Sequence, residues 1–384
     1  MNTPTFPLPF SEPIHIAGIQ ARAYEVPIAQ AVRTSFGKMH ARPAVFVRVV
    51  DSHGQEGWGE VWCNFPPGGA AYKRHLVNHV FAPMLEGRSV DDPRKLFDTL
   101  TRATDVLGIQ CGEPGPLAHC IAGIDIALWD LAARRTGLPL WKLLGGRSSD
   151  IAVYASGINP DRPADVVQTQ SDQGHRAFKL KIGFGEETDI ANLRAIRDAV
   201  GSEAPVMADA NQAWDVDTAE RMISRLKDFG LDWIEEPLRA DRPWQEWRRL
   251  LPLGTPLAAG ENVMGASAFD DALQAGSLSV VQPDVAKWGG FSGCLPVATR
   301  ILSSGRRYCP HFLGGGIGLL ASAHLLAAAG GDGMLEIDAN PNPLRTLTCG
   351  PLARPEKGRV RLDDAAGLGH APDFDQLREY EVAF

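Results

Sequence analysis

Eight short apolar runs between residues 151 and 337 constrain the fold of this chain more than any other feature. Helix-like stretches, such as Thr188–Val200 and Leu319–Ala328, separate them. The runs are Ile151–Ser156, Ala177–Ile182, Pro205–Asp209, Leu231–Glu235, Pro256–Gly260, Leu278–Gln282, Arg307–Pro310 and Met334–Ile337. Strands that alternate with helices predict a parallel α/β sheet, either closed into a barrel or doubly wound. Eight units favour the closed (β/α) barrel, although its last helix is not evident.

A different order of elements precedes the barrel. Strands are predicted at Ile14–Val26, Ala44–Asp51 and Gly57–Trp62, and helices follow at Ala71–Met84 and Leu117–Thr136. Strands followed by segregated helices indicate an α+β module. We therefore expect an α+β domain in residues 1–149, the barrel in 150–350, and a segment 351–384 that returns to the first domain. The first dozen residues are expected to form a mobile arm.

Composition excludes several classes of protein. The formal net charge of −8 argues against nucleic-acid binding, which requires clustered basic residues. The longest apolar run, Gly318–Gly330, is too short to span a bilayer, and the N-terminus lacks a secretion signal. The six cysteines form no CxxC pair and are interpreted as reduced thiols. These features predict a cytoplasmic enzyme with no membrane or nucleic-acid partner.

Three acidic residues recur at the ends of consecutive predicted strands. Asp209, Glu235 and Glu261 lie 26 residues apart, which is one βα unit each time. In a parallel barrel these strand ends share one mouth, where active sites of this architecture are built. Three carboxylates crowded there would repel unless a cation neutralised them, and oxygen ligands suit Mg²⁺. The alternative is that each acid caps a helix or pairs with a surface base.

Basic residues fall at the same mouth. Lys179 and Lys181 end the second run and face the same way, because residues two apart on a strand share a face. A neighbouring ammonium and partial burial are expected to lower the pKa of such a lysine and make it a base. Asp284 ends the sixth run and His311 follows the seventh, an arrangement that predicts a His–Asp dyad for proton transfer.

The motifs KLK, DAN, IEEP, GEN, PDVAKWGG and LEID, together with GWGE near the start, resemble the enolase superfamily, mandelate racemase subgroup. The resemblance covers nearly the whole chain, and the motifs stand in the family's order and spacing. It implies a (β/α) barrel of modified TIM type with an N-terminal α+β capping domain. It also implies Mg²⁺-dependent removal of the proton α to a carboxylate, through a metal-stabilised enediolate.

The resemblance implies a role for each matching residue. Asp209, Glu235 and Glu261 would bind Mg²⁺, and Lys181 would transfer the proton, with Lys179 tuning it and contacting the substrate carboxylate. His311, paired with Asp284, would be the second acid or base. Glu336, in its protonated form, would donate a hydrogen bond to the substrate carboxylate, and Asn211 would lie near the α-hydroxyl. In related lactonizing and epimerase branches a catalytic lysine occupies the position of Asp284, and Lys287 does not fill that place.

The substrate is expected to be a small carboxylate. Arg33, Lys38 and His40 lie in the N-terminal region that, by resemblance, caps the barrel and selects substrate. Their polarity favours dehydration of an acid sugar to a 2-keto-3-deoxy acid. The alternatives are a racemase or epimerase of a 2-hydroxy acid and, with less support, a non-catalytic barrel. The family also implies a homo-oligomer.

One segment departs from the pattern of mandelate racemase. The stretch Phe312–Gly318 after His311 is rich in glycine. It lacks the strand–GxGxxG–helix context of a phosphate-binding loop, so phosphate cradling is the weaker interpretation.

Overall fold

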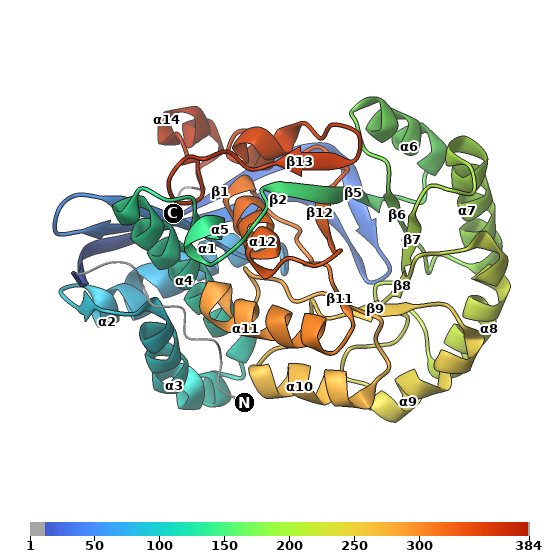
Figure 1. Cartoon of the computed structure of the whole chain (residues 1–384), viewed down its shortest axis with the longest axis horizontal. Coiled ribbons are helices and arrows are strands. Elements are labelled where there is room, and N and C mark those ends of the chain that lie inside the picture. The colour runs from blue at the N-terminus through green and yellow to red at the C-terminus, as the bar shows by residue number, and fades with distance from the viewer. Residues whose placement is uncertain (1–11, 383–384) are drawn as a thin grey trace.

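A computed structural model describes residues 12–382 and contains a parallel barrel beside a smaller antiparallel sheet (Figure 1). The barrel strands are β5 (Asp150–Ile158), β6 (Phe178–Lys181), β7 (Val206–Asp209), β8 (Ile234–Glu235), β9 (Leu257–Ala259), β10 (Val280–Val281), β11 (Arg307–Tyr308) and β12 (Met334–Asp338). Each of the eight predicted runs overlaps one of these strands, which confirms the barrel. The expected mobile arm falls on residues 1–11, which lie outside the described residues.

The barrel is nearly closed. Its strands pair in parallel in the order β11-β10-β9-β8-β7-β6-β5-β12, and this path pairs β12 with β5 but not with β11. The helices that follow the strands are α6 (Pro163–Asp172), α7 (Glu186–Val200), α8 (Val216–Leu226), α9 (Trp244–Arg249), α10 (Ala266–Ala275), α11 (Gly290–Ser303), α12 (Gly316–Ala329) and the short α13 (Pro343–Thr346). The shortness of α13 explains why no last helix was evident in the sequence.

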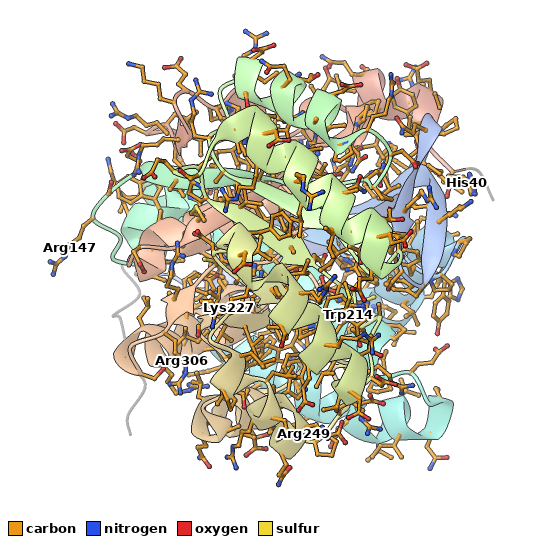
Figure 2. All side chains as sticks on the ribbon, turned by 90° about the vertical axis from the view of Figure 1, so that its right-hand side faces the viewer. His40, Arg147, Trp214, Lys227, Arg249 and Arg306 are labelled. Atoms are coloured by element: carbon orange, nitrogen blue, oxygen red, sulfur yellow. The ribbon has the colours of Figure 1, made fainter. Side chains whose placement is uncertain are left out.

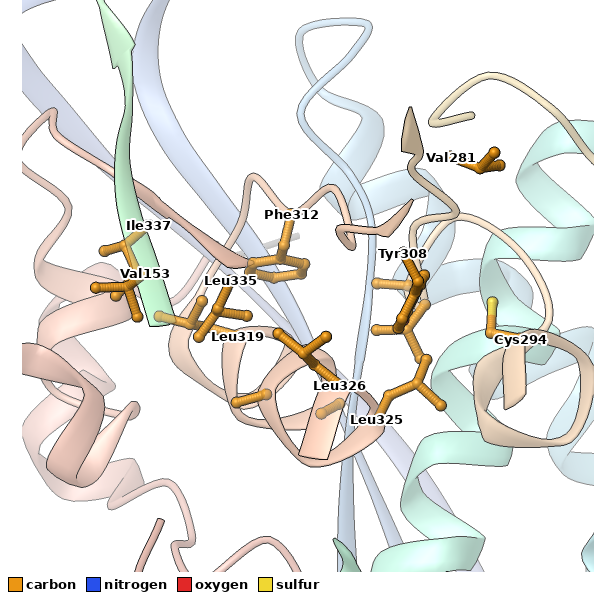
Figure 3. Close-up of a cluster of buried hydrophobic side chains, with 14 of the residues drawn as sticks. Val153, Val281, Cys294, Tyr308, Phe312, Leu319, Leu325, Leu326, Leu335 and Ile337 are labelled. Atoms are coloured by element: carbon orange, nitrogen blue, oxygen red, sulfur yellow. The ribbon is translucent and has the colours of Figure 1, made fainter. Parts of the chain in front are cut away.

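Helix α12 closes the gap between the last two strands. Figure 3 shows Leu325 and Leu326 of α12 between Tyr308 of β11 and Leu335 of β12, all of them buried. Twelve of the 14 residues of this helix are buried, so its apolar sequence belongs to the core.

The N-terminal domain is an antiparallel sheet covered by helices. Its strands are β1 (Ile14–Thr34), β2 (Gly37–Asp51), β3 (Glu56–Val61) and β4 (Ser89–Val90), in the order β3-β2-β1-β4. Its helices are α1 (Gly69–Leu76), α2 (Ala82–Leu85), α3 (Pro93–Cys111), α4 (Pro114–Thr136) and α5 (Leu140–Leu143). Strand β1 continues past the predicted end at Val26, because the hairpin resumes after an irregular register between Pro27 and Val32. The tip of this hairpin reaches the barrel mouth, where Ser35 Oγ donates to the Asn211 carbonyl at 2.6 Å.

Helix α4 lies between the two parts of the molecule. It is long and apolar enough to cross a membrane, but 89% of its most apolar window is buried inside the protein. On one side it packs on β3, where Gly59 allows a close approach to the carbonyl of Gly123. On the other side Trp129 Nε1 donates to Ser292 Oγ of α11 at 2.9 Å. Its hydrophobicity therefore belongs to the interior of the fold.

The C-terminal segment contacts both parts. Strand β13 (Arg359–Arg361) pairs antiparallel with β5. Phe374, in α14 (Phe374–Leu377), packs against Tyr24 and Trp58 of the N-terminal sheet, and the Val382 amide donates to the Ala23 carbonyl at 2.9 Å. The division at residues 149 and 350 stays a prediction, and these contacts fit its third segment.

The β3–α4 contact generates a stability prediction. In Gly59→Ala the new methyl group would lie 2.0 Å from the Gly123 carbonyl oxygen. Overpacking of this kind lowers the free energy of unfolding by about 1–3 kcal/mol, so the guanidinium denaturation midpoint should fall. Gly18→Ala is the control, because a methyl group there meets no atom within 4 Å. Equal midpoints for the two variants would contradict this packing.

Candidate active site

The floor of the barrel interior is a layer of inward-facing side chains, one from each strand or its edge. These buried residues are Tyr154, Ala177, Met207, Trp233, Ala258, Val280, Cys309 and Met334. Side chains alternate along a strand, so the residue two positions further on faces the same interior, nearer the mouth. Those positions carry Ser156, Lys179, Asp209, Glu235, Gly260, Gln282, His311 and Glu336. The strand period therefore gathers a polar layer above the floor, and Cys309 is one of the side chains that fill the floor.

A cavity of about 300 Å³ opens above this layer, between the strand ends and the N-terminal domain. Its barrel lining consists of Ser156, Gly157, Lys181, Asp209, Asn211, Gln212, Glu261, Asn262, Lys287, His311, Leu313 and Glu336. The N-terminal domain contributes Val32, Thr34, Phe36, Trp62 and Phe65. The predicted Lys181, His311, Asp209, Glu261, Asn211 and Glu336 are thus brought to one cavity, with Lys179, Glu235 and Asp284 directly behind them.

Each of the three predicted carboxylates has a different cationic partner. Lys179 Nζ lies 2.7 Å from Glu235 Oε2, and Lys181 Nζ lies 3.1 Å from Asp209 Oδ2. His311 Nε2 contacts Glu261 Oε2. Asp209 and Glu235 are register partners on β7 and β8, which fixes them side by side. The acids are therefore neutralised in pairs with the bases.

The expected lowering of the Lys181 pKa is wrong for this arrangement. Burial, the largest single effect, lowers the pKa of the Lys181 ammonium, but the charge and hydrogen bond of Asp209 and the charge of Glu261 together outweigh it, and the net shift is upward. Lys179 does lower the pKa, as the sequence suggested, but by a smaller amount. Lys181 is charged here, and its Nζ also donates to Asn211 Oδ1 at 2.6 Å.

The expected protonated form of Glu336 is also wrong here. Burial raises the pKa of Glu336, but the charges of Lys179 and His311 lower it more, so the net shift is downward. Lys179 Nζ lies 2.8 Å from Glu336 Oε1, and the Phe312 amide donates to Oε2 at 3.1 Å. Glu336 is therefore an anion that accepts hydrogen bonds.

The predicted His–Asp dyad is present. His311 Nδ1 lies 2.7 Å from Asp284 Oδ2. The other oxygen of Asp284 accepts from the Ala286 and Lys287 amides at 2.8 and 3.1 Å, so the turn after β10 holds the carboxylate in place. Burial lowers the pKa of His311, but the charges of Glu261 and Glu336 and the bond to Asp284 raise it well above its ordinary value.

Backbone strain is concentrated at the same strand ends. Asn211, Gln212 and Glu236 have φ values of 44°, 65° and 39°, a region that costs side-chain-bearing residues roughly 1–3 kcal/mol each. The buried Glu236 carboxylate accepts from Asn262 Nδ2 at 2.9 and 3.1 Å. Burial and repulsion by Glu261 and Asp209 raise the pKa of Glu236 well above its ordinary value. Such strain persists where the surroundings require it, as at functional sites.

The polar selectivity residues expected in the N-terminal domain do not line the cavity. Lys38 and His40 are exposed, and His40 lies at the edge of the molecule in Figure 2. Arg33 instead pairs with Asp161 at 2.9 Å. Alternation along the hairpin turns Val32, Thr34 and Phe36 toward the mouth, and Phe36 packs against Phe65 with ring centres 5.2 Å apart. The expectation of a polar roof is therefore wrong: the three polar side chains do not face the cavity, whose roof is largely apolar.

Several cavity residues were not predicted from the sequence, and three of them have large polar or aromatic side chains. Lys287, Asn262 and Trp62 all line the cavity. Asn262 and Lys287 stand inside the GEN and PDVAKWGG motifs, and Trp62 follows GWGE by two residues. Their positions in or beside these motifs could have marked them as candidates. A side chain just past the end of a strand no longer follows the alternation of the strand, so the sequence does not show whether it points into the cavity.

The glycine-rich stretch after His311 binds a carboxylate of the protein itself. Glu60, the last residue of GWGE, accepts from the Gly315 and Gly318 amides at the start of α12, at 2.5 and 2.7 Å. Negative charge is favoured at a helix N-terminus, which explains the pairing. Burial raises the pKa of Glu60 to about 7 although the amides lower it. The stretch joins the two domains, and no phosphate is needed to explain it.

The donor set suits a hard divalent cation. Its carboxylate oxygens, with the amides of Asn211 and Asn262 beside them, have the chemistry that Mg²⁺ prefers. Ammonium and imidazole groups already stand against these carboxylates, which shows that the site requires positive charge. Among residues 12–382, no three acidic, histidine or cysteine side chains are gathered as a ready metal site. A cation would therefore have to exchange places with the lysine and histidine contacts.

The fold and the site can now be compared with known protein families. Residues 17–145 match the mandelate racemase/muconate lactonizing enzyme N-terminal domain, and residues 162–376 match the enolase C-terminal domain-like family. The chain belongs to this family and is an enzyme of the enolase superfamily, as the sequence motifs indicated.

Individual relatives show which reactions are found among proteins similar to this chain. A crystal structure of a mandelate racemase/muconate lactonizing enzyme from Bordetella bronchiseptica RB50 is 53% identical, with a TM-score of 0.91 over 96% of this chain and 99% of that one. A racemase from Streptomyces coelicolor A3(2), crystallised with bound magnesium, is 29% identical, with a TM-score of 0.86 over 96% and 100%. D-galactarolactone cycloisomerase from Agrobacterium fabrum is 31% identical over 89% of this chain and 92% of its own. L-talarate/galactarate dehydratase from Salmonella typhimurium is 35% identical over 75% and 71%.

Proposed function

We propose that this enzyme removes the proton α to a carboxylate with the help of Mg²⁺, and that it dehydrates an acid sugar to a 2-keto-3-deoxy acid. The observation that carries the proposal is that two proton carriers, Lys181 and His311, line one cavity together with Asp209 and Glu261. The matched family and the sugar-acid relatives support the same chemistry. A cytoplasmic location and homo-oligomeric assembly belong to this proposal as well.

Asp209, Glu235 and Glu261 would hold the ion. When bound, Mg²⁺ supplies positive charge to the substrate carboxylate, whose oxygens become more negative as the α-proton leaves. Lys179 lies behind the cavity wall and bridges Glu235 and Glu336 at 2.7 and 2.8 Å, so it would donate a hydrogen bond to the substrate carboxylate only when the ion replaces it at Glu235. Both interactions strengthen in the transition state, which is what accelerates the reaction.

Lys181 would be the base that accepts the α-proton. It must be neutral to do so, and in this structure Asp209 keeps it charged. Once Asp209 has another cationic partner, burial and the neighbouring Lys179 both favour the neutral amine. Asn211, which accepts from Lys181 Nζ at 2.6 Å, then orients the amine and the substrate α-hydroxyl.

His311 would be the acid. Asp284 holds its ring at 2.7 Å and keeps the imidazolium stable. As the C–H bond breaks toward Lys181, its electron pair would move into the bond between the α-carbon and the carboxylate carbon, which gives the enediolate; the double bond to the β-carbon would form only as the β-hydroxyl departs. The β-hydroxyl then leaves as water with the proton from His311, and the resulting enol tautomerises to the 2-keto acid.

Racemisation of a 2-hydroxy acid is the second candidate. It requires two proton carriers, and Lys181 and His311 supply them in one cavity. The apolar roof formed by Val32, Phe36 and Phe65 would suit an acid without many hydroxyl groups. In this reaction His311 would return a proton to the α-carbon in place of releasing water.

Metal binding tests the ligand assignment. Titration calorimetry of the metal-free protein should detect one Mg²⁺ site. Asp209→Asn, Glu235→Gln and Glu261→Gln should each weaken it by roughly tenfold or more, because each removes a charged ligand oxygen. Asp241→Asn, at an exposed position, is the matched control and should bind like the parent. Unchanged affinity in all three site variants would contradict the assignment.

Reaction in D₂O distinguishes the two candidate functions. With Mg²⁺ and a library of sugar acids and 2-hydroxy acids, a new 2-keto acid in the NMR spectrum indicates dehydration. Deuterium at the α-carbon with the hydroxyl retained indicates racemisation. Lys181→Ala and His311→Asn should each lower kcat by about 10²–10⁴, whereas Lys38→Ala should not. Full activity in both site variants would exclude the two-carrier mechanism.

A further inference from the structure

Lys287 is a buried ammonium in the cavity wall with an incomplete set of partners. It extends from the loop after β10, and the residue is only 8% exposed. Its Nζ donates to Asn262 Oδ1 at 2.8 Å and lies 4.7 Å from the centre of the Trp62 ring. Its one ion pair among the described residues is a long one, 3.8 Å to Glu261 Oε1, which is beyond hydrogen-bond distance.

The other cations of the mouth are better paired. Lys179 and Lys181 each have a carboxylate oxygen within 3.1 Å, and His311 contacts two carboxylates. Glu261 is shared with His311, and the proposed function assigns it to Mg²⁺. Lys287 is therefore left without a carboxylate of its own. Buried charges are normally paired, so this ammonium points to an anion supplied from the cavity.

A second buried lysine adds to the positive charge of this corner. Lys73 is 2% exposed, lies 4.6 Å from the Trp62 ring centre, and forms no ion pair in the described part of the chain. Burial, with a smaller effect of Lys287, lowers the pKa of Lys73 to about 8. His119 packs against the Trp62 ring, and burial with these two lysines lowers the pKa of His119 well below its ordinary value. Among the described residues, the 3.8 Å contact between Lys287 and Glu261 is the only ion pair that either of these two lysines forms.

We propose that Lys287 binds a second carboxylate of the substrate, so that the substrate is a dicarboxylic acid. The proposal rests on the proposed function for the place of the reacting carboxylate, beside Asp209 and Glu261. Lys287 and Trp62 line the cavity, and the remaining roof is largely apolar, formed by Val32, Phe36 and Phe65 with Thr34. A cavity of about 300 Å³ lies at the small end of ligand pockets and limits the diacid to a compact metabolite.

Binding of unreactive acids tests the subsite without depending on turnover. Adipate and 6-hydroxyhexanoate differ only in one terminal carboxylate, and neither has a β-hydroxyl to lose. Titration calorimetry of the Mg²⁺-loaded parent protein should show adipate binding at least tenfold more tightly. Lys287→Met should reduce this preference to less than twofold while 6-hydroxyhexanoate binds as before, and Lys287→Arg should retain part of the preference. The matched control is Lys38→Met, which changes an exposed lysine outside the cavity.

The outcomes separate the subsite from the reacting site. If the parent protein binds both acids equally, or Lys287→Met keeps the preference, the second carboxylate does not bind at Lys287. If the parent protein binds neither acid, the site for the reacting carboxylate fails, and the subsite proposal falls with the proposed function. The comparison of adipate with 6-hydroxyhexanoate in the parent protein needs no variant. It therefore tests the proposal even if Lys287→Met does not fold.

Discussion

Crowding of negative charge at the barrel mouth is the constraint on which the site depends. Asp209, Glu235, Glu236 and Glu261 lie at the ends of three neighbouring strands, largely removed from water. Burial of an ion costs several kcal/mol unless it is paired. The structure meets this cost with lysine and histidine partners at three of the acids. At Glu236 the upward pKa shift favours the neutral form. The proposed proton carriers and the proposed ligands of the cation are thus paired with each other in one network of charges.

Carboxylates also fasten the two domains together. Glu60 accepts from amides at the start of α12, and Asp125 of α4 accepts from the Ser292 amide near the start of α11 at 3.0 Å. Burial raises the pKa of each to about 7. The two helices follow the strand ends that carry His311 and Asp284, respectively. The N-terminal domain is therefore anchored next to the His311–Asp284 pair, and its hairpin is held over the cavity.

The parts of the site that obey the strand period could be predicted from the sequence. The barrel, the acids at the ends of β7 and β8, and the Lys179–Lys181 pair all follow from alternation and βα spacing. The His311–Asp284 contact could be expected because neighbouring strands carry these residues. Charge states could not be predicted, because the sign of the Lys181 shift depends on a 3.1 Å contact with Asp209. Nor does the strand period place a residue beyond a strand end, such as Lys287, or show which face of the β1–β2 hairpin turns toward the cavity.

The central claim is that the three carboxylates exchange their lysine and histidine partners for one divalent ion. A crystal structure of the protein grown with Mn²⁺, as an anomalous substitute for Mg²⁺, tests this most directly. The claim predicts one strong anomalous peak in contact with oxygens of Asp209, Glu235 and Glu261, with Lys181 no longer bonded to Asp209. A peak elsewhere, or a mouth in which the carboxylates keep their present partners at saturating metal, would contradict it.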